Sequence, residues 1–305
     1  MDTSLRIGLI GYGEVGGTLT RALRERGIAW VGAWDVLFRD PARGPAMMSR
    51  ARDGGIEVCA SAADLLARVD IAISAVTASN ALEVAREAAT AIRRGAYFLD
   101  LNSASPATKS AAARLVDAAG AHYVEAGVMT SVPPYGIRAP MLLGGGHAAA
   151  LAARLVPLGF DMTVVADEIG VASAIKMCRS VVIKGIEAIV IESYATARRH
   201  GVERQVIASL RETFPGIDWE KQGAYFFSRV VKHGRRRAEE MREVANTVRE
   251  AGFEPRLSAA TAEKQDWVAA LAASGLFRDL PAEPDWRDYA DRMIAGVPPR
   301  GKKTA

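Results

Sequence analysis

A glycine-rich turn near the start of the chain has the residue types and spacing that suit the pyrophosphate of a dinucleotide. It follows the apolar run Leu5 to Ile10 and reads Gly11-Tyr12-Gly13-Glu14-Val15-Gly16. The first glycine permits a tight turn, the second lets the backbone approach the phosphates, and the third lets the next helix pack against the strand. The free N–H groups at the start of that helix would face the phosphates. We therefore predict that all six residues contact a cofactor.

An acidic residue at the end of the second predicted strand supports this interpretation. Asp35 lies 19 positions after Gly16 (35 − 16), close to the spacing at which an acid binds the adenosine ribose hydroxyls. Its carboxylate would repel a 2′-phosphate, which favours NAD, whereas nearby Arg39 leaves NADP possible. The alternatives are a turn without a ligand and a turn that binds another adenosine-containing molecule, such as a methyl donor.

A parallel sheet is needed to position these residues, and the pattern along residues 1–167 predicts one. Apolar runs of strand length alternate with helical patterns, and further strands are expected at 29–34, 56–59, 71–76, 96–99, 122–125 and 140–143. Three helices are expected to begin at polar caps, at Ser61, at Ser79 or Asn80, and at Ser105-Pro106. This alternation is typical of a doubly wound, mainly parallel α/β sheet of the Rossmann type.

After residue 167 the alternation stops and the pattern is almost entirely helical. We predict an all-α domain over residues 168–298, for substrate binding and oligomerisation, and a disordered tail over 299–305. The chain has 305 residues, of which 50% are hydrophobic and 24% charged. It is therefore long and apolar enough for two cores, and it does not have the composition of a disordered protein.

Polar side chains follow the fourth and fifth predicted strands, at the edge of the sheet where α/β folds bind ligands. Val76 and Thr77 follow the fourth strand, and we predict that they contact the cofactor. Asn102 and Ser103 follow the fifth strand, and both can donate and accept hydrogen bonds, as a nicotinamide amide or a substrate oxygen requires. An equally weighted alternative is that Asn102, Ser103 and Ser105 only form the turn and cap the next helix.

The predicted helix from residue 170 to about 199 is apolar except along one stripe. Lys176, Ser180 and Lys184 recur every four residues and Glu187 continues the stripe, so the four share one helix face. We expect so apolar a helix to be buried between the domains, where an unpaired lysine is costly. Lys184 pairs with Glu187 or contacts the substrate. Lys176 has no acid three or four positions away, and a buried amine of lowered pKa suits a general acid or base.

Together these features resemble the β-hydroxyacid dehydrogenase superfamily, which includes 6-phosphogluconate and 3-hydroxyisobutyrate dehydrogenases. The resemblance covers most of the first 200 residues. Asp100-x-Asn102-Ser103 is similar to the family's loop at the nicotinamide and substrate, residues 125–131 are similar to its substrate-binding strand and loop, and Lys176 falls on its catalytic lysine. Residues 176–185 and 233–267 are more similar to a less characterised, phosphogluconate-dehydrogenase-like bacterial branch with its own C-terminal helical domain.

Two departures from the family pattern concern substrate contacts. Met129-Thr130-Ser131 stands where the family usually has Ser-Gly-Gly, and Ser180 stands where it usually has Asn. Both positions touch substrate in relatives. We therefore expect the lysine chemistry to be kept and the substrate to differ from 6-phosphogluconate.

The resemblance implies an NAD(P)-dependent oxidoreductase that needs no metal. Hydride would pass between nicotinamide and the carbinol or carbonyl carbon of a small, acidic hydroxy substrate, while Lys176 moves the proton. The residues expected to orient the substrate are Asn102, Ser103, Thr130, Ser131 and Ser180, and Arg179 or Lys184 would hold its anionic group. Imine reduction is one alternative, and a dinucleotide-sensing protein without catalysis is another.

Charge and composition exclude several other partners. The net charge is only +4, and no basic stripe with interleaved aromatic residues suggests nucleic-acid binding. No uncharged apolar run is long enough for a bilayer, the first residues lack a signal-peptide layout, and two cysteines form no disulfide framework. We therefore expect a cytoplasmic protein. Relatives are dimers or larger, which implies a homodimer or higher homo-oligomer.

Overall fold

The computed structural model describes residues 2–296, and its chain divides into two compact units. Of the described residues, the first unit comprises 2–178 with 250–252, and the second comprises 179–249 with 253–296. The division falls inside one long helix, α7 (Val171–His200), so the first two turns of that helix belong with the first unit. The predicted tail, residues 299–305, lies outside the described residues.

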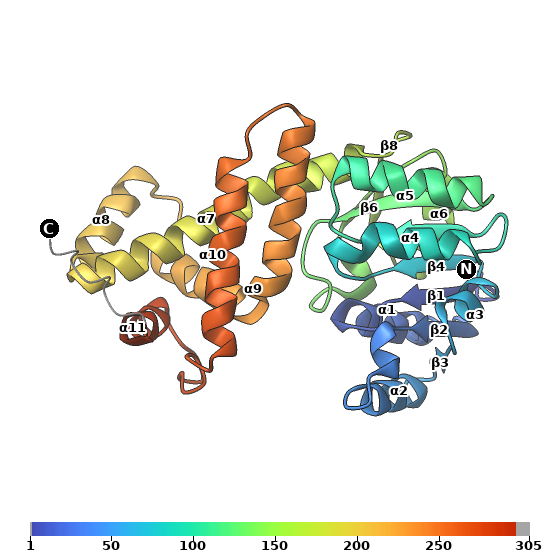
Figure 1. Cartoon of the computed structure of the whole chain (residues 1–305), viewed down its shortest axis with the longest axis horizontal. Coiled ribbons are helices and arrows are strands. Elements are labelled where there is room, and N and C mark those ends of the chain that lie inside the picture. Colours follow the sequence, from blue (N-terminus) through green and yellow to red (C-terminus); the bar gives the residue numbers. More distant parts are fainter. Residues whose placement is uncertain (1, 297–305) are drawn as a thin grey trace, which may run out of the picture. The chain divides into compact units, whose positions relative to one another are not determined.

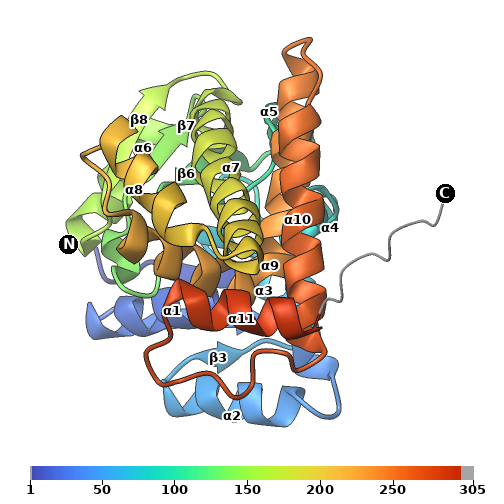
Figure 2. The same cartoon turned by 90° about the vertical axis from the view of Figure 1, so that its left-hand side faces the viewer.

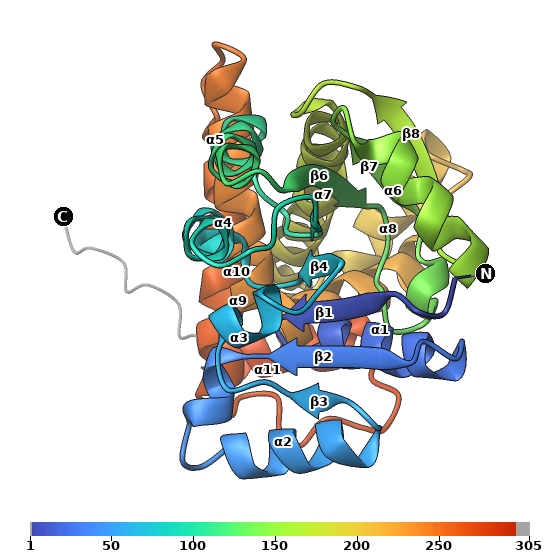
Figure 3. The ribbon, with the colours of Figure 1, turned by 90° about the vertical axis from the view of Figure 1, so that its right-hand side faces the viewer.

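An eight-stranded sheet forms the centre of the first unit, in the order β3-β2-β1-β4-β5-β6-β7-β8 (Figures 1 and 3). The strands are β1 (Arg6–Ile10), β2 (Trp30–Trp34), β3 (Glu57–Val58), β4 (Ile71–Ser74), β5 (Tyr97–Asp100), β6 (His122–Val128), β7 (Met141–Gly144) and β8 (Met162–Ala166). Every neighbouring pair is parallel except β6 and β7. The predicted doubly wound, mainly parallel sheet is confirmed.

Helices cover both faces of this sheet, as its apolar strands require. Figure 3 shows α3 (Ala62–Leu66), α4 (Ala81–Ala89) and α5 (Pro106–Ala118) on one side, and α1 (Glu14–Glu25) and α6 (Ala148–Leu155) on the other. The buried side chains of α1, α2 (Gly44–Asp53) and α6 form one apolar cluster with the strands. Those of α3, α4 and α5 form a second cluster. The strands are therefore buried from both sides.

Two of the three predicted helix caps are present. The Ser61 hydroxyl accepts a hydrogen bond from the Asp64 N–H at 3.0 Å, and the Ser105 hydroxyl accepts one from the Thr108 N–H at 3.3 Å. Asn80 occupies the position before α4 but makes no capping bond. Its amide donates to the Thr77 hydroxyl instead, at 2.8 Å, so the Asn80 alternative for this cap is wrong, while the Ser79 alternative stays a prediction.

The described residues of the second unit, 179–249 and 253–296, form helices joined by loops and contain no strand. It contains the rest of α7, then α8 (Glu203–Thr213), α9 (Trp219–Glu250), α10 (Arg256–Ala273) and α11 (Trp286–Gly296). The long helices α9 and α10 form a hairpin (Figures 1 and 2). The aromatic residues Tyr194, Phe227 and Trp286 lie at the centre of the unit's apolar core. The predicted all-α class of the C-terminal region is confirmed, while its predicted bounds, 168–298, and its role in substrate binding and oligomerisation stay predictions.

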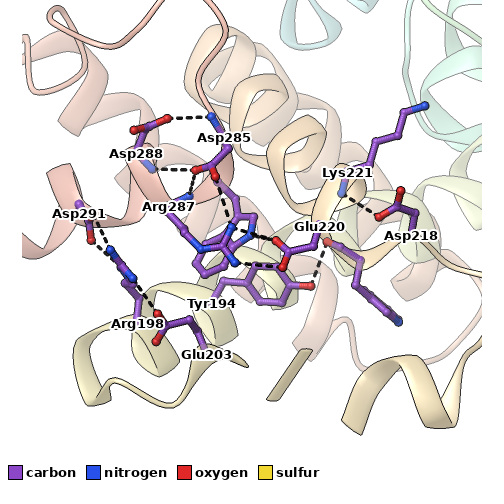
Figure 4. A network of polar contacts seen from close by, with 12 residues as sticks. Tyr194, Arg198, Glu203, Asp218, Glu220, Lys221, Asp285, Arg287, Asp288 and Asp291 are labelled. Carbon is purple, nitrogen blue, oxygen red and sulfur yellow. Dashed lines mark hydrogen bonds and ion pairs between the residues drawn. The ribbon is translucent and has the colours of Figure 1, made fainter. Parts of the chain in front are cut away.

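A network of ion pairs joins four helices at one end of this unit (Figure 4). Arg198 of α7 pairs with Glu203 at 2.7 Å and with Asp291 of α11 at 2.8 Å. Glu220 of α9 accepts hydrogen bonds from Arg287 at 2.9 Å and from the Trp286 ring N–H at 2.6 Å. These contacts hold helix ends together, and they involve none of the predicted site residues.

No helix in the described part of the chain has the length and apolar character needed to cross a membrane. Among residues 2–296, His, Cys, Asp and Glu side chains do not gather in groups of three or more that could hold a metal ion.

Candidate functional site

The glycine turn between β1 and α1 has the geometry that dinucleotide binding requires. Gly11 has φ +96°, and a side chain there would collide with the carbonyl oxygen of Ala75. A side chain at Gly16 would collide with the carbonyl oxygen of Gly11. By contrast, apart from Gly13 itself and its neighbours along the chain, no atom lies within 4 Å of where a Cβ on Gly13 would stand. The turn is therefore closed where the protein packs and open where phosphates would approach the backbone.

This turn lies at the point where the strand order reverses. The chain runs outward from β1 through β2 to β3 on one side and from β4 to β8 on the other, and such a switch point is where open α/β sheets bind ligands. The Gly11 N–H donates to the carbonyl of Trp34 at 2.9 Å. Val76 lies against the same glycine on the other side, and Thr77 beside it is exposed. The structure thus brings the turn, Val76 and Thr77 together at one edge of the sheet.

Asp35 is connected to the glycine turn through the backbone. One carboxylate oxygen accepts a hydrogen bond from the Tyr12 N–H at 2.6 Å, and the other accepts one from the Leu37 N–H at 2.8 Å. The side chain is largely buried, and the Tyr12 ring packs against Phe38. Asp35 therefore braces the turn, a role the spacing argument did not include.

Asn102 points into the protein. Its side-chain oxygen accepts from the Val76 N–H at 2.7 Å, and its NH2 group donates to the Ser74 hydroxyl at 2.9 Å. Only 3% of the residue is exposed. This placement matches the turn-forming alternative, because the amide joins the two loops that follow β4 and β5. Ser103, the next residue, is half-buried.

A buried polar row lies beneath these loops, and sequence reasoning missed it. Asp100 pairs in register with Ser74 on one side and Glu125 on the other, so the three side chains share a face of the sheet. The Asp100 carboxylate binds the Lys109 ammonium at 3.0 Å and the Tyr123 hydroxyl at 2.7 Å. Burial, followed by the charge of Asp100, raises the pKa of Tyr123 well above its usual value.

Lys176 lies beside the end of β6. It is half-buried in the second turn of α7, less deeply than the stripe of polar residues suggested. A Cβ on Gly127 would stand 3.5 Å from the Cβ of Lys176, so the missing side chain lets the helix approach the strand. Because β6 is parallel to β5, this is the same edge of the sheet that carries the glycine turn. Exposed Thr130 and half-buried Ser131 follow β6 at that edge.

The other predicted substrate residues belong to the second unit. Arg179 is exposed and Ser180 is buried. Lys184 is buried and forms an ion pair with Glu240 of α9 at 2.6 Å, while Glu187 pairs with Arg237 of the same helix. The predicted Lys184–Glu187 pair is therefore wrong, because each charge has a partner on α9. Burial lowers the pKa of Lys184 and raises that of Glu187.

Two family models match the chain, one in each unit. Residues 6–157 match the NAD binding domain of 6-phosphogluconate dehydrogenase. Residues 197–268 match a domain of unknown function, DUF1932. A curated relative, an uncharacterised 28.5 kDa protein of Methanothermus fervidus, is 28% identical and aligns over 82% of this chain and 94% of its own length.

Two solved structures are more than 30% identical to this chain. A conserved hypothetical protein from Sinorhizobium meliloti is 36% identical, with a TM-score of 0.74 over 96% of this chain and 97% of that one. A conserved protein of unknown function, described as structurally similar to 3-hydroxyacid dehydrogenases, is 32% identical. Its TM-score is 0.66, over 89% of this chain and 99% of that one.

More distant structures share the fold. Mycobacterium tuberculosis 3-hydroxyisobutyrate dehydrogenase is 18% identical, with a TM-score of 0.66 over 95% of this chain and 99% of that one. A reductive aminase from Aspergillus terreus is 18% identical, with a TM-score of 0.56 over 89% of this chain and 95% of that one. The chain therefore belongs to the proteins that join a nicotinamide-dinucleotide-binding domain of the 6-phosphogluconate dehydrogenase type to a DUF1932 helical domain.

Proposed function

We propose that this protein is an NAD-dependent oxidoreductase acting on the carbinol or carbonyl carbon of a small, acidic hydroxy substrate, with Lys176 as general acid and base. The observation that carries the proposal is the place of Lys176. It stands at the C-terminal end of β6, on the same sheet edge as the glycine turn. An amine at that edge would lie beside a substrate bound next to the dinucleotide.

The residues present fit a dinucleotide. The open space at Gly13 and the N–H groups at the start of α1 would hold the pyrophosphate. Asp35 would accept hydrogen bonds from the adenosine ribose, and its charge disfavours a 2′-phosphate, which supports NAD over NADP. Val76 and Thr77 would line the path along the sheet edge. When bound, the nicotinamide supplies or accepts the hydride.

The chain's own residues would handle the proton and the substrate. The Lys176 amine would take the hydroxyl proton during oxidation and return it during reduction. The hydroxyls of Ser103, Thr130 and Ser131 would orient the substrate from the loops after β5 and β6. Contacts from Arg179 and Ser180 of the second unit stay a prediction. We now expect Lys184 to stabilise the helical unit, since Glu240 already neutralises it.

Replacing the lysine tests this proposal. Hydroxy acids, sugar acids and their phosphates would be screened with NAD and NADP by the absorbance of the reduced nicotinamide. On the best substrate, Lys176→Met should lower turnover by roughly 10²- to 10⁴-fold, while the affinity for NADH, measured by fluorescence, stays close to that of the unmodified protein. Lys221→Met is the matched control, because Lys221 is exposed in the second unit. Unchanged turnover in Lys176→Met would refute the assignment.

Imine reduction is the second candidate, and the fold shared with a reductive aminase favours it. Ketones offered alone and ketones offered with amines, assayed in parallel, separate the two reactions. A third possibility is dinucleotide sensing without catalysis. Tight NADH binding, with no turnover on either panel, would support sensing against both enzymatic proposals.

The proposal includes assembly into a homodimer or larger homo-oligomer. Val182 and Ile189 of α7 are 58% and 62% exposed, and residues seven positions apart lie on one helix face. Such apolar residues are usual where a second subunit packs. Light scattering should give at least twice the mass of one chain, and a monomeric mass over the working concentration range would contradict this part.

A further inference from the structure

Glu125 caps a helix that lies far from it in the sequence. One of its carboxylate oxygens, Oε1, accepts hydrogen bonds from the Gly170 N–H at 2.7 Å and the Ala172 N–H at 3.0 Å. These are the backbone groups at the start of α7, which have no acceptor within the helix. The residue is completely buried in β6, and a negative charge is favourable at a helix N-terminus.

Two glycines make room for this contact. Gly144 of β7 lies opposite Glu125 in the antiparallel pair, and a Cβ on it would stand 2.5 Å from Glu125 Oε1. Gly127, two positions along β6 and therefore on the same face, allows the first turn of α7 to approach. A Cβ there would stand 2.9 Å from the Ala172 carbonyl oxygen and 3.5 Å from the Lys176 Cβ. The helix start is thus fastened to β6 by a carboxylate and by close backbone packing.

The fastened turn is the turn that precedes Lys176. Ala172 and Lys176 are four positions apart, so Lys176 lies directly above the residue whose N–H binds Glu125. Side chains in a helix lean toward its N-terminus, which directs Lys176 back toward the clamp. The compact first unit ends at Cys178, so this turn of α7 keeps the lysine with the sheet.

We propose that Glu125 is a positioning residue for Lys176: its carboxylate fastens the first turn of α7 to β6 and thereby fixes the lysine at the strand-end edge of the sheet. The chemical purpose of this positioning rests on the proposed function, but the clamp itself can be measured without any turnover.

Three variants of the full-length protein test the clamp. Glu125→Ala removes the acceptor. Gly144→Ala keeps the Glu125 side chain but forces its Oε1 away from the position in which it accepts both hydrogen bonds. Glu125→Gln keeps an acceptor oxygen in a side chain of the same shape. Exposed Glu168, in the loop before α7, provides the matched control Glu168→Gln. Hydrogen exchange of residues 170–177 is measured in each. The rate at which an amine reagent modifies Lys176 is measured against that of exposed Lys221.

The expected results follow from the loss of a helix cap. Exchange over residues 170–177 should become roughly 3- to 30-fold faster in Glu125→Ala and Gly144→Ala. Lys176 should be modified at least about threefold faster relative to Lys221, because a loosened turn exposes it. Glu125→Gln should stay within about threefold of the unmodified protein on both measures, and Glu168→Gln should not differ from it.

The proposal would be overturned if either Glu125→Ala or Gly144→Ala folds and shows unchanged exchange rates over residues 170–177 and an unchanged labelling rate at Lys176. If Glu125→Ala does not fold, Gly144→Ala and Glu125→Gln decide the question. Faster exchange without any change at Lys176 would show a merely structural cap, and it would also overturn the proposal. Because neither readout needs a substrate, a failure of the dehydrogenase assignment, seen as full turnover in Lys176→Met, is recognised separately.

Discussion

The ion pair between Lys109 and Asp100 carries the most testable energetic consequence of the buried polar row. Both side chains are about 1% exposed, and Lys109 Nζ lies 3.0 Å from one carboxylate oxygen and 2.9 Å from the Asp100 carbonyl oxygen. Lys109→Met would leave that carboxylate with the Tyr123 hydroxyl and the Asn102 N–H. Breaking a buried pair costs about 3–5 kcal/mol. Because two hydrogen bonds to the Asp100 carboxylate remain, we expect Lys109→Met to lower the stability of the first unit by about 3 kcal/mol, the lower end of this range.

The assay must separate the stability of the first unit from that of the second. Hydrogen exchange in increasing urea gives a free energy of opening for residues 97–101 of β5, while residues of α9 serve as an internal control. The single variant Asp100→Asn and the double variant Lys109→Met with Asp100→Asn complete a thermodynamic cycle. The double variant should be at least about 1 kcal/mol more stable than the sum of the single losses predicts, because no charge is stranded. The reasoning would be refuted if Lys109→Met lowers the free energy of opening by less than about 1 kcal/mol, or if the losses of the two single variants add up strictly in the double variant.

Three further predictions concern the first unit. Gly13→Ala should keep the unfolding temperature of the unmodified protein, because the added methyl group meets open space. It should nevertheless weaken NADH binding by at least roughly tenfold in a fluorescence titration. Equal affinity would show that the turn does not hold phosphates. Asp35→Ser should bind both NAD and NADP more weakly, because the Tyr12 N–H loses its hydrogen bond to the carboxylate. The ratio of the two affinities should nevertheless shift roughly tenfold towards NADP, because a negative charge is removed. An unchanged ratio would contradict the charge argument. Burial, and then the neighbouring His147, lowers the pKa of His122 below 6.5. As the pH falls, the unfolded chain therefore binds this proton before the folded protein does. The stability present above pH 6.5 is lost as the pH falls through the folded-state pKa. His122→Asn should therefore show a smaller fall in unfolding temperature between pH 7.5 and pH 5.5, and an equal fall would place the titrating group elsewhere.

The sheet could be predicted from the sequence because its strands are buried on both faces. A strand such as Ile71–Ser74 has no exposed residue, so it appears in the sequence as an uninterrupted apolar run. Helix starts such as Ser105-Pro106 could be predicted because a cap is a local interaction between residues three apart. The glycine turn combines both kinds of signal, which explains why its place between a strand and a helix could be predicted.

The elements that were not predicted lack these local signals. Strand β8 lies at the edge of the sheet and has no buried residue, so Met162–Ala166 shows no clear pattern of burial. Helices α2 and α6 follow Arg43 and His147, neither of which makes a side-chain capping bond. The ion-pair partner of Lys184 could not be found either, because Glu240 lies on another helix 56 positions away.

The polar residues at the strand ends illustrate a more general limit. Sequence position shows that a side chain is near the carboxyl edge of the sheet, but it does not show whether the side chain points along the edge or back into the fold. Asn102 and Asp100 point back, where each joins neighbouring strands and loops, while Thr77 and Thr130 are exposed at the same edge. A buried amide that must satisfy two partners needs a matching donor and acceptor within reach. For Asn102 these come from Ser74, at the end of β4, and from Val76, in the loop after it. Ligand contacts at this edge should therefore come from the exposed hydroxyls, and substitutions in the buried row should alter binding only through the loops that it holds.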